Sequence, residues 1–399
     1  MDDVAAASWW DERTLRRLVL GGFVLRLALL MASDGSNDIA TWERFARDIE
    51  QWGVIEEYRH AADFNHPPLM GWWSLIALKA ATLTSIPFRF WFKLLPLAAD
   101  VVATRLAWSI GRRRGRPLDG WRAAAVASTG LVSIWITSHH GNTDSVCALL
   151  VLISAWCLHA HGAPLAAGLA FAGALNVKLI PLVALPALVL QLRSFDAALR
   201  FGSGLAVGLL PFLAPALMVW DEFFKNAIQY TSNRNRWGIP GILMSVQELG
   251  LAAPGARLME VAWAGLGRYV IMGLSVLIGF RTRRLRLTSY HACALALASF
   301  LFFAPGFGVQ YMIYPFALLV AVDLRRAAIY GFVAGLFVSA DYLHYAEQWF
   351  PLTTAHSAPF AWWVAAFGFI SWFVLGELLV TLLLNSGRDG ERKRVVWRS

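Results

Sequence analysis

Two aspartates close to the N-terminus, Asp34 and Asp38, are the residues of this sequence best suited to act as a general base. They follow the first long apolar run and precede apolar residues that recur at helical spacing. A carboxylate in such a place can take the proton of an attacking hydroxyl group. A structural role is also open for Asp38, because aspartate is a favoured N-cap residue and Asp38 stands just before the amphipathic run.

Three cations, Lys178, Arg234 and Arg236, fall on the side of the membrane that is expected to be poor in basic residues. A phosphate partner explains them, since arginine grips phosphate oxygens through a bidentate fork. A phosphate leaving group needs cationic neighbours and no general acid. One aspartate and a few cations are therefore the only side chains that transfer of a group from a phosphate carrier requires.

Further polar residues on the same side are candidates for substrate binding: His66, His139, His140, Asp144, Gln310 and Tyr311. The histidine pair could instead be interfacial, and Asp144 could cap the helix that follows it. The sequence predicts neither a metal site nor a cofactor, because no further ligands stand at metal-binding spacing. The three cysteines, at positions 147, 157 and 293, all lie inside apolar stretches and predict no disulfide framework.

The composition is that of an integral membrane protein. Hydrophobic residues make up 58% of the chain and charged residues only 15%, and there are 19 tryptophans. A soluble protein carries about a quarter charged residues. The net charge of +9 does not indicate nucleic acid, because the basic residues cluster between apolar runs. We therefore expect an all-α polytopic membrane protein.

Apolar runs long enough to cross a bilayer predict about twelve transmembrane spans. They lie near residues 15–32, 88–110, 121–138, 144–160, 163–177, 179–193, 199–219, 260–279, 288–304, 311–323, 327–342 and 360–384. Both termini are then cytoplasmic, and all the large basic clusters fall on that side. Residues 67–85 are also apolar, but counting them as a span would move the cluster at 112–116 outside. They are expected to form a re-entrant or interfacial helix within a long first outer loop, residues 33–87.

The same loop holds a segment with a clear amphipathic pattern. Its apolar positions recur at helical spacing: Ile39, Trp42, Phe45, Ala46, Ile49 and Trp52. Charged residues stand between them. This pattern predicts a helix that lies along the membrane surface.

Five short motifs occur in order on the outer side. They are Asn65-His66-Pro67-Pro68-Leu69, His140-Gly141-Asn142-Thr143-Asp144, Asn176-Val177-Lys178-Leu179-Ile180-Pro181, Ser232-Asn233-Arg234-Asn235-Arg236-Trp237-Gly238 and Gly308-Val309-Gln310-Tyr311. Together with the early acidic stretch, they resemble the GT-C superfamily of membrane glycosyltransferases. Within it, the chain is similar to the dolichyl-phosphate-glucose glucosyltransferases and to the first GPI mannosyltransferase, over residues 15 to about 315.

The resemblance implies an inverting transfer of a hexose, mannose or glucose, from a polyprenyl-phosphate donor to a lipid, glycan or protein hydroxyl. Asp38 would be the base, with Asp34 as the runner-up, and Lys178, Arg234 and Arg236 would hold the donor phosphate. No metal or other cofactor and no nucleic acid would take part. The site would lie on the periplasmic or extracellular face of a cell (inner) membrane. His66 stands where an aromatic residue is common, which leaves the sugar and the acceptor open.

The implied organisation has five parts. They are a cytoplasmic N-terminus (1–14), a GT-C transmembrane module (15–219), an outer loop on the donor and acceptor side (220–259), variable C-terminal spans (260–385) and a basic cytoplasmic tail (386–399). A transporter or lipid flippase is the main alternative. Transporters place charges at the midplane between two related halves, whereas the polar residues here gather on one side and the halves do not match.

Overall fold

A computed structural model describes residues 11–230, 232, 235–250, 255–349, 351–355 and 359–392. The first half contains α1 (Glu12–Ala32), β1 (Ser33–Ser36), α2 (Asn37–Trp52), α3 (Glu57–His60), α4 (Pro68–Thr84), α5 (Phe88–Arg112), α6 (Asp119–Thr129), α7 (Leu131–Ile134), the π-turn η1 (Trp135–His140), α8 (Asp144–His161) and α9 (Pro164–Val177).

The second half is also helical. It contains η2 (Ile180–Ala184), α10 (Leu185–Val189), α11 (Phe195–Ala216), η3 (Leu217–Val219), α12 (Trp220–Phe223), η4 (Phe224–Ile228), α13 (Gly238–Glu248), α14 (Gly255–Arg284), α15 (Ser289–Phe303), η5 (Val309–Met312), α16 (Ile313–Val322), α17 (Leu324–His344), β2 (Ala346–Trp349), β3 (Leu352–Thr354) and α18 (Trp362–Arg392).

The predicted all-α membrane class is confirmed. Within the described residues, six helical segments are long and apolar enough to cross a membrane: Phe88–Arg112, Asp144–His161, Phe195–Ile228, Leu258–Arg284, Leu324–His344 and Trp362–Leu384. Shorter apolar helices occupy four more of the expected spans: Pro164–Val177, Ile180–Val189, Ser289–Phe303 and Val309–Val322. The count of twelve spans stays a prediction. The last helix continues to Arg392, beyond the expected end of its span at residue 384.

Close helix packing in the bundle depends on small residues. A side-chain carbon on Gly168 of α9 would lie 2.1 Å from the carbonyl oxygen of Phe201, and one on Gly204 of α11 would lie 2.2 Å from that of Leu165. Only glycine lets the two backbones approach so closely, as at many helix contacts in membranes. This close approach fixes α9 against α11, and α8 also packs on α9.

A buried ionic cluster joins α1 to α5 and α6. The Nε of Arg26 lies 2.8 Å from Oδ2 of Asp100, and the Ser133 hydroxyl donates to the same oxygen at 2.6 Å. The guanidinium also donates to the carbonyl oxygens of Gly22 and Ser128. Arg26 is fully buried. Two charges can remain inside such a bundle only because each is paired and hydrogen-bonded.

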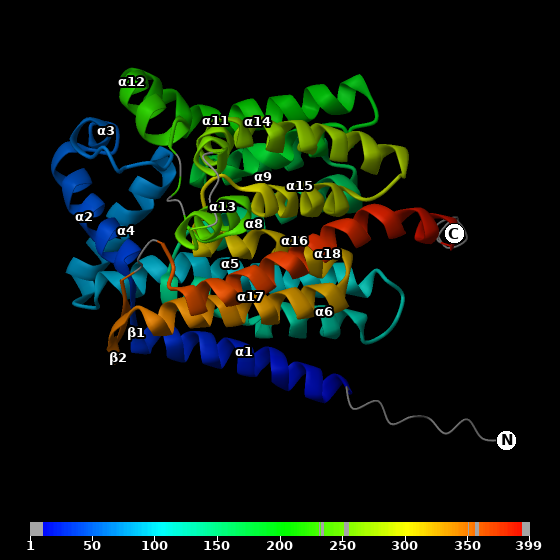
Figure 1. The fold of residues 1–399 in the computed structure, drawn as a ribbon, viewed down its shortest axis with the longest axis horizontal. Coiled ribbons are helices and arrows are strands. Elements are labelled where there is room, and N and C mark those ends of the chain that lie inside the picture. Colours follow the sequence, from blue (N-terminus) through cyan, green and yellow to red (C-terminus); the bar gives the residue numbers. More distant parts are fainter. Residues whose placement is uncertain are drawn as a thin grey trace.

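The helices α2, α3 and α4 and the small sheet gather at one end of the bundle, while α1 begins and α18 ends at the other (Figure 1). The sheet has the order β1-β3-β2, with β1 parallel to β3 and β2 antiparallel to β3. It joins the segment after the first helix to a segment more than three hundred residues later. The expected re-entrant stretch, residues 67–85, is the helix α4.

The amphipathic helix is α2, but its apolar face does not lie on a membrane surface as predicted. Trp42 and Phe45 are each 2% exposed, and Trp42 stacks on Phe92 of α5 at 5.3 Å. Phe45 meets Phe64 edge-on at 5.0 Å. Trp52 alone of the six apolar positions remains exposed, at 47%. The apolar stripe therefore faces the protein core and packs α2 against the rest of the molecule.

Candidate active site

A polar cavity of about 210 Å³ opens at the end of the bundle that carries α2 and the sheet. Its lining residues come from the loop after α1, from the motifs that contain His140 and Lys178, and from the second half of the chain. They are Asn37, Asp38, Thr41, Trp42, Phe45, Asp63, Asn65, His66, His140, Asn142, Lys178, Tyr230, Ser232, Asn235, Phe307, Gly308, Val309, Gln310, Tyr311 and Phe360. The cavity thus brings together residues from all five of the motifs that the sequence singled out.

Asp38 lies on one wall of the cavity, at the second residue of α2. The predicted cap role is wrong, since the Ser36 side chain accepts the Asp38 backbone N–H at 3.3 Å and is the N-cap. The Asp38 carboxylate is thereby left for other contacts. Its Oδ2 accepts hydrogen bonds from Nε2 of His140 at 2.9 Å and from Nδ2 of Asn142 at 2.7 Å. The side chain is 35% exposed, so a substrate can reach it.

His140 and Asn142 are held in place by a tight backbone turn. The π-turn η1 ends at Gly141, which has a φ of 69° and donates its N–H to Ile136. A side chain on Gly141 would clash with Ile39, only 2.7 Å away. The Asn142 Oδ1 accepts the backbone N–H of Thr143 at 2.6 Å, so its amide nitrogen must face Asp38. Two fixed donors therefore orient the Asp38 carboxylate.

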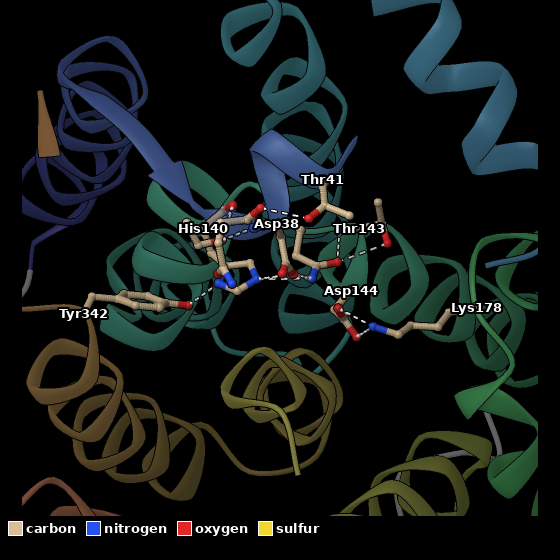
Figure 2. Close-up of polar contacts among 10 residues, drawn as sticks. Asp38, Thr41, His140, Thr143, Asp144, Lys178 and Tyr342 are labelled. Carbon is tan, nitrogen blue, oxygen red and sulfur yellow. Dashed lines mark hydrogen bonds and ion pairs between the residues drawn. The ribbon is translucent and has the colours of Figure 1, made fainter. Parts of the chain in front are cut away.

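Lys178 lies on another wall and forms an ion pair with Asp144, which is not itself among the lining residues; the two side chains point toward each other in Figure 2. The Lys178 ammonium donates to both carboxylate oxygens, at 2.9 and 3.1 Å, and lies 5.1 Å from the centre of the Tyr311 ring. The Tyr314 hydroxyl donates to Asp144 at 2.7 Å. The proposed cap role of Asp144 is not observed, because Asp144 is the first residue of α8 and its side chain serves Lys178 and Tyr314 instead.

His66 lines the cavity and contacts residues next to both Asp38 and Lys178. Its ring packs on Trp42 at 4.7 Å, and its Nδ1 lies 3.5 Å from the carbonyl oxygen of Val177. Burial, with a smaller contribution from the nearby Lys178, lowers the pKa of His66 to about 4. The imidazole is therefore neutral at physiological pH. It can donate or accept a hydrogen bond, but it adds no positive charge to the cavity.

Gln310 and Tyr311 reach the cavity from η5, as the substrate-binding prediction requires. Tyr311 is 4% exposed and has the Lys178 ammonium over its ring. The carbonyl oxygen of Gly308 accepts the Tyr311 N–H at 2.9 Å, which closes the turn that presents both side chains. Tyr311 thus lies beside the cation, and Gln310 lines the same cavity.

Asp34 and His139 are not among the lining residues. Asp34 pairs with Arg89 at 2.8 Å. His139 is fully buried and bridges Ser33, at 2.5 Å, to Thr354, at 3.0 Å, which ties β1 to β3. Asp34 thus lies in β1 and pairs with α5, and His139 supports the sheet from η1. Their predicted roles, as base and as substrate ligand, stay predictions that the geometry does not favour.

Of the two predicted phosphate-binding arginines, one lies among the described residues and the other does not. Arg236 does not line the cavity: its guanidinium donates to both oxygens of Glu248 at 2.8 Å and lies 4.6 Å from the centre of the Trp362 ring. Arg234 lies outside the described residues, between Ser232 and Asn235, which both line the cavity. The phosphate role of each arginine stays a prediction.

Several residues were missed by the sequence reasoning. Asn142 was read as part of a motif but not as a ligand of the Asp38 carboxylate. Tyr342 of α17 was ignored with the rest of the variable C-terminal spans, yet its hydroxyl lies 2.8 Å from Nδ1 of His140. Lys93, buried within α5, donates to the carbonyl oxygen of Ser33 at 2.9 Å. A lysine inside an apolar run is itself a signal of function or anchoring, and that signal could have found Lys93.

A family model described as Glycosyltransferase family 87 matches residues 64–305. The match spans more than half of the 399 residues and includes the motifs of His66, His140 and Lys178. No curated protein matches the chain. The resemblance to membrane glycosyltransferases is thereby confirmed at the level of the family. The narrower similarity to the dolichyl-phosphate-glucose glucosyltransferases and to the first GPI mannosyltransferase stays a prediction.

Proposed function

Because the chain belongs to glycosyltransferase family 87, we propose that it is a GT-C-type enzyme that moves a hexose from a polyprenyl-phosphate donor to an acceptor hydroxyl. The acceptor is a lipid, a glycan or a protein. Mannose and glucose are the sugars that the resemblance favours. The observation that carries the proposal is that Asp38 and Lys178 line one and the same cavity.

The two residues are suited to opposite ends of the reacting bond. Asp38 is an oriented, partly exposed carboxylate and can accept a proton. Lys178 uses two of its three N–H donors on Asp144, and a phosphate oxygen can take the third. The cavity is small beside the range of about 300–1,000 Å³ that is usual for drug-sized ligands. It suits a sugar and its phosphate, with the polyprenyl chain left in the membrane.

In the proposed reaction, the acceptor oxygen attacks the anomeric carbon of the donor sugar and its proton passes to Asp38. The bond from that carbon to the phosphate oxygen breaks, and the polyprenyl phosphate leaves with the electron pair. Attack from the face opposite the phosphate inverts the configuration at the anomeric carbon. Lys178 stabilises the negative charge on the departing phosphate, and Arg234 and Arg236 are further candidates for this role.

The placement of the enzyme is part of the proposal. We expect an inner or cytoplasmic membrane with both termini in the cytoplasm and the cavity on the periplasmic or extracellular face. The arrangement of the ends supports this, since the start of α1 and the end of α18 lie at the end of the bundle opposite the cavity (Figure 1). Polyprenyl-phosphate sugars would then reach the cavity from the outer leaflet.

The direct test uses the purified protein in lipid nanodiscs with synthetic polyprenyl-phosphate mannose and glucose, a panel of acceptors, and mass analysis of the released lipid phosphate. Asp38→Asn should lower transfer by about 10²–10⁴-fold, the usual contribution of a positioned base. Nucleotide-diphosphate sugars serve as alternative donors. Transfer from these alone would overturn the donor class.

Asp34→Asn is the matched variant. It removes a carboxylate four residues away that pairs with Arg89 and does not line the cavity. A partly exposed pair contributes about 0–1 kcal/mol, so transfer per folded molecule should stay near that of the unaltered protein. If Asp34→Asn abolished transfer while Asp38→Asn retained it, the base would be Asp34.

A further inference from the structure

Three side chains from distant parts of the chain form a continuous hydrogen-bonded row at the cavity wall. The Tyr342 hydroxyl lies 2.8 Å from Nδ1 of His140, and Nε2 of His140 lies 2.9 Å from Oδ2 of Asp38. Figure 2 shows the His140 ring between Tyr342 and Asp38. His140 is 1% exposed and Tyr342 is fully buried, so solvent competes little for these bonds.

The direction of each bond follows from the chemistry of its ends. A neutral imidazole carries one N–H, on one ring nitrogen or the other. An ionised carboxylate can only accept, so the bond to Asp38 requires the hydrogen on Nε2. The lone pair is then on Nδ1, and the Tyr342 hydroxyl donates to it. In the other tautomer, the Nε2 lone pair could accept only from Nδ2 of Asn142, 3.1 Å away, and the bond to the Asp38 carboxylate would be lost.

We infer that Tyr342 is a positioning residue for sugar transfer, because its hydroxyl selects the Nε2–H form of His140 and thereby holds the Asp38 carboxylate in place. The inference rests on the proposed function, since it takes Asp38 as the base. It also assigns a role to α17, which lies beyond the residues that the family model matches.

Other charged groups surround the row and stay unchanged in the variants below. Asp341 on α17 and Asp144 at the start of α8 act electrostatically on Tyr342. Lys178 is paired to Asp144. Lys93 of α5 packs against Gly141, next to His140, and His139 precedes it in η1. A difference in pH profile between two variants therefore reports the contact that was changed, and not these neighbours.

The test is the activity of Tyr342→Phe relative to the unaltered protein across pH. Without the hydroxyl, His140 can take the unproductive tautomer, and kcat should fall on the order of tenfold at about pH 8. Acid favours the form of the ring that is protonated on both nitrogens, and that form restores the donor to Asp38. The ratio of variant to unaltered activity should therefore rise as the pH is lowered stepwise from about 8.

Tyr330→Phe is the matched control. Tyr330 is a buried tyrosine on the same helix, and its hydroxyl donates to the carbonyl oxygen of Met312 at 3.0 Å. Its removal should give an activity ratio that does not change with pH. The folded fraction of each variant is measured at each pH value and activities are compared per folded molecule, so partial unfolding of Tyr342→Phe does not enter the ratio.

A second measurement uses His140→Gln. The glutamine amide has donor hydrogens and no tautomers, so adding Tyr342→Phe to His140→Gln should leave the shape of the pH profile unchanged. A pH-independent loss in Tyr342→Phe, or no loss at all, would overturn the role of Tyr342. Failure of the proposed function looks different, because Asp38→Asn would then retain activity.

Discussion

Two buried carboxylate–cation pairs lie in this bundle and differ in what surrounds them. Arg26 pairs with Asp100 at 2.8 Å, and Lys178 pairs with Asp144 at 2.9 Å. Both cations are poorly exposed: the exposed fraction of the side chain is 0% for Arg26 and 12% for Lys178. By sequence, the two pairs are equivalent: each is a cation and an aspartate in or beside apolar runs.

The difference lies in the remaining hydrogen-bond donors. The Arg26 guanidinium uses its other N–H groups on backbone carbonyls and on the Ser133 hydroxyl, and that hydroxyl in turn serves Asp100. We call this the closed pair. Lys178 borders the cavity, and within the part of the chain that the structure describes its hydrogen bonds go to Asp144 alone, so we call these two residues the open pair. A buried cation can bind a ligand only when one of its donors is left for it, which is why we propose Lys178 and not Arg26 as a phosphate ligand.

The largest effect is expected at the closed pair. Arg26→Met leaves Asp100 as an uncompensated buried charge, which costs about 3–5 kcal/mol. The variant should lose most of its thermal stability, measured by unfolding in detergent. The double variant Arg26→Met, Asp100→Leu should recover it, because an apolar pair of similar volume replaces the ionic one. Normal stability of the single variant would show that the closed pair is not structural.

A different pattern is expected at the open pair. Lys178→Met should lower transfer by about 100-fold, through loss of charge stabilisation on the leaving phosphate. The apparent affinity for the donor should weaken more than that for the acceptor. The double variant Lys178→Met, Asp144→Leu should regain stability but not transfer. If transfer returned with stability, the comparison between the two pairs would fail, because both would then be structural.

The smallest effect concerns a buried carboxylate that forms no ion pair among the described residues. Glu57 of α3 is 0% exposed, and neither of its oxygens has a hydrogen-bond partner among the described residues. Desolvation raises the pKa of Glu57 from 4.5 to about 7. Below about pH 4.5 the carboxyl group is neutral in both the folded and unfolded states. As the pH rises through about 7, the folded state must ionise a buried group, so stability is lost.

Glu57→Gln should therefore remove part of the fall in melting temperature between about pH 5 and pH 8. Glu56→Gln is the control, since the Glu56 carboxylate is 47% exposed and pairs with Arg59. If the melting temperature varied with pH in the same way for both variants, ionisation of the buried Glu57 carboxyl group would not destabilise the protein. Either result bears on the comparison above, because it measures what a missing partner costs.

Much of the fold was within reach of the sequence. Long apolar runs predicted the spanning helices, and the helical spacing of Ile39, Trp42 and Phe45 predicted α2. The surface to which α2 binds could not be predicted, because an apolar stripe packs equally well on lipid or on protein. Its contact with Phe64 and Phe92 depends on where the later segments lie.

The site was predicted in part. Asp38, Lys178 and His140 were named as candidates and line one cavity, whereas Arg236 was named and pairs with Glu248 instead. Residue type and sidedness brought all four into consideration. They could not separate a cation that faces a cavity from one that faces a carboxylate, since that choice depends on a partner far away in the sequence.

The sequence by itself determined the membrane environment and indicated that candidate site residues gather at one end of the bundle. Both follow from hydrophobicity and charge, which are local properties that add up along the chain. Only the tertiary structure decided that Tyr342 meets His140 and that β3 pairs with β1 beside Asp38. Such contacts join residues about two to three hundred positions apart, and their geometry depends on how every intervening helix packs.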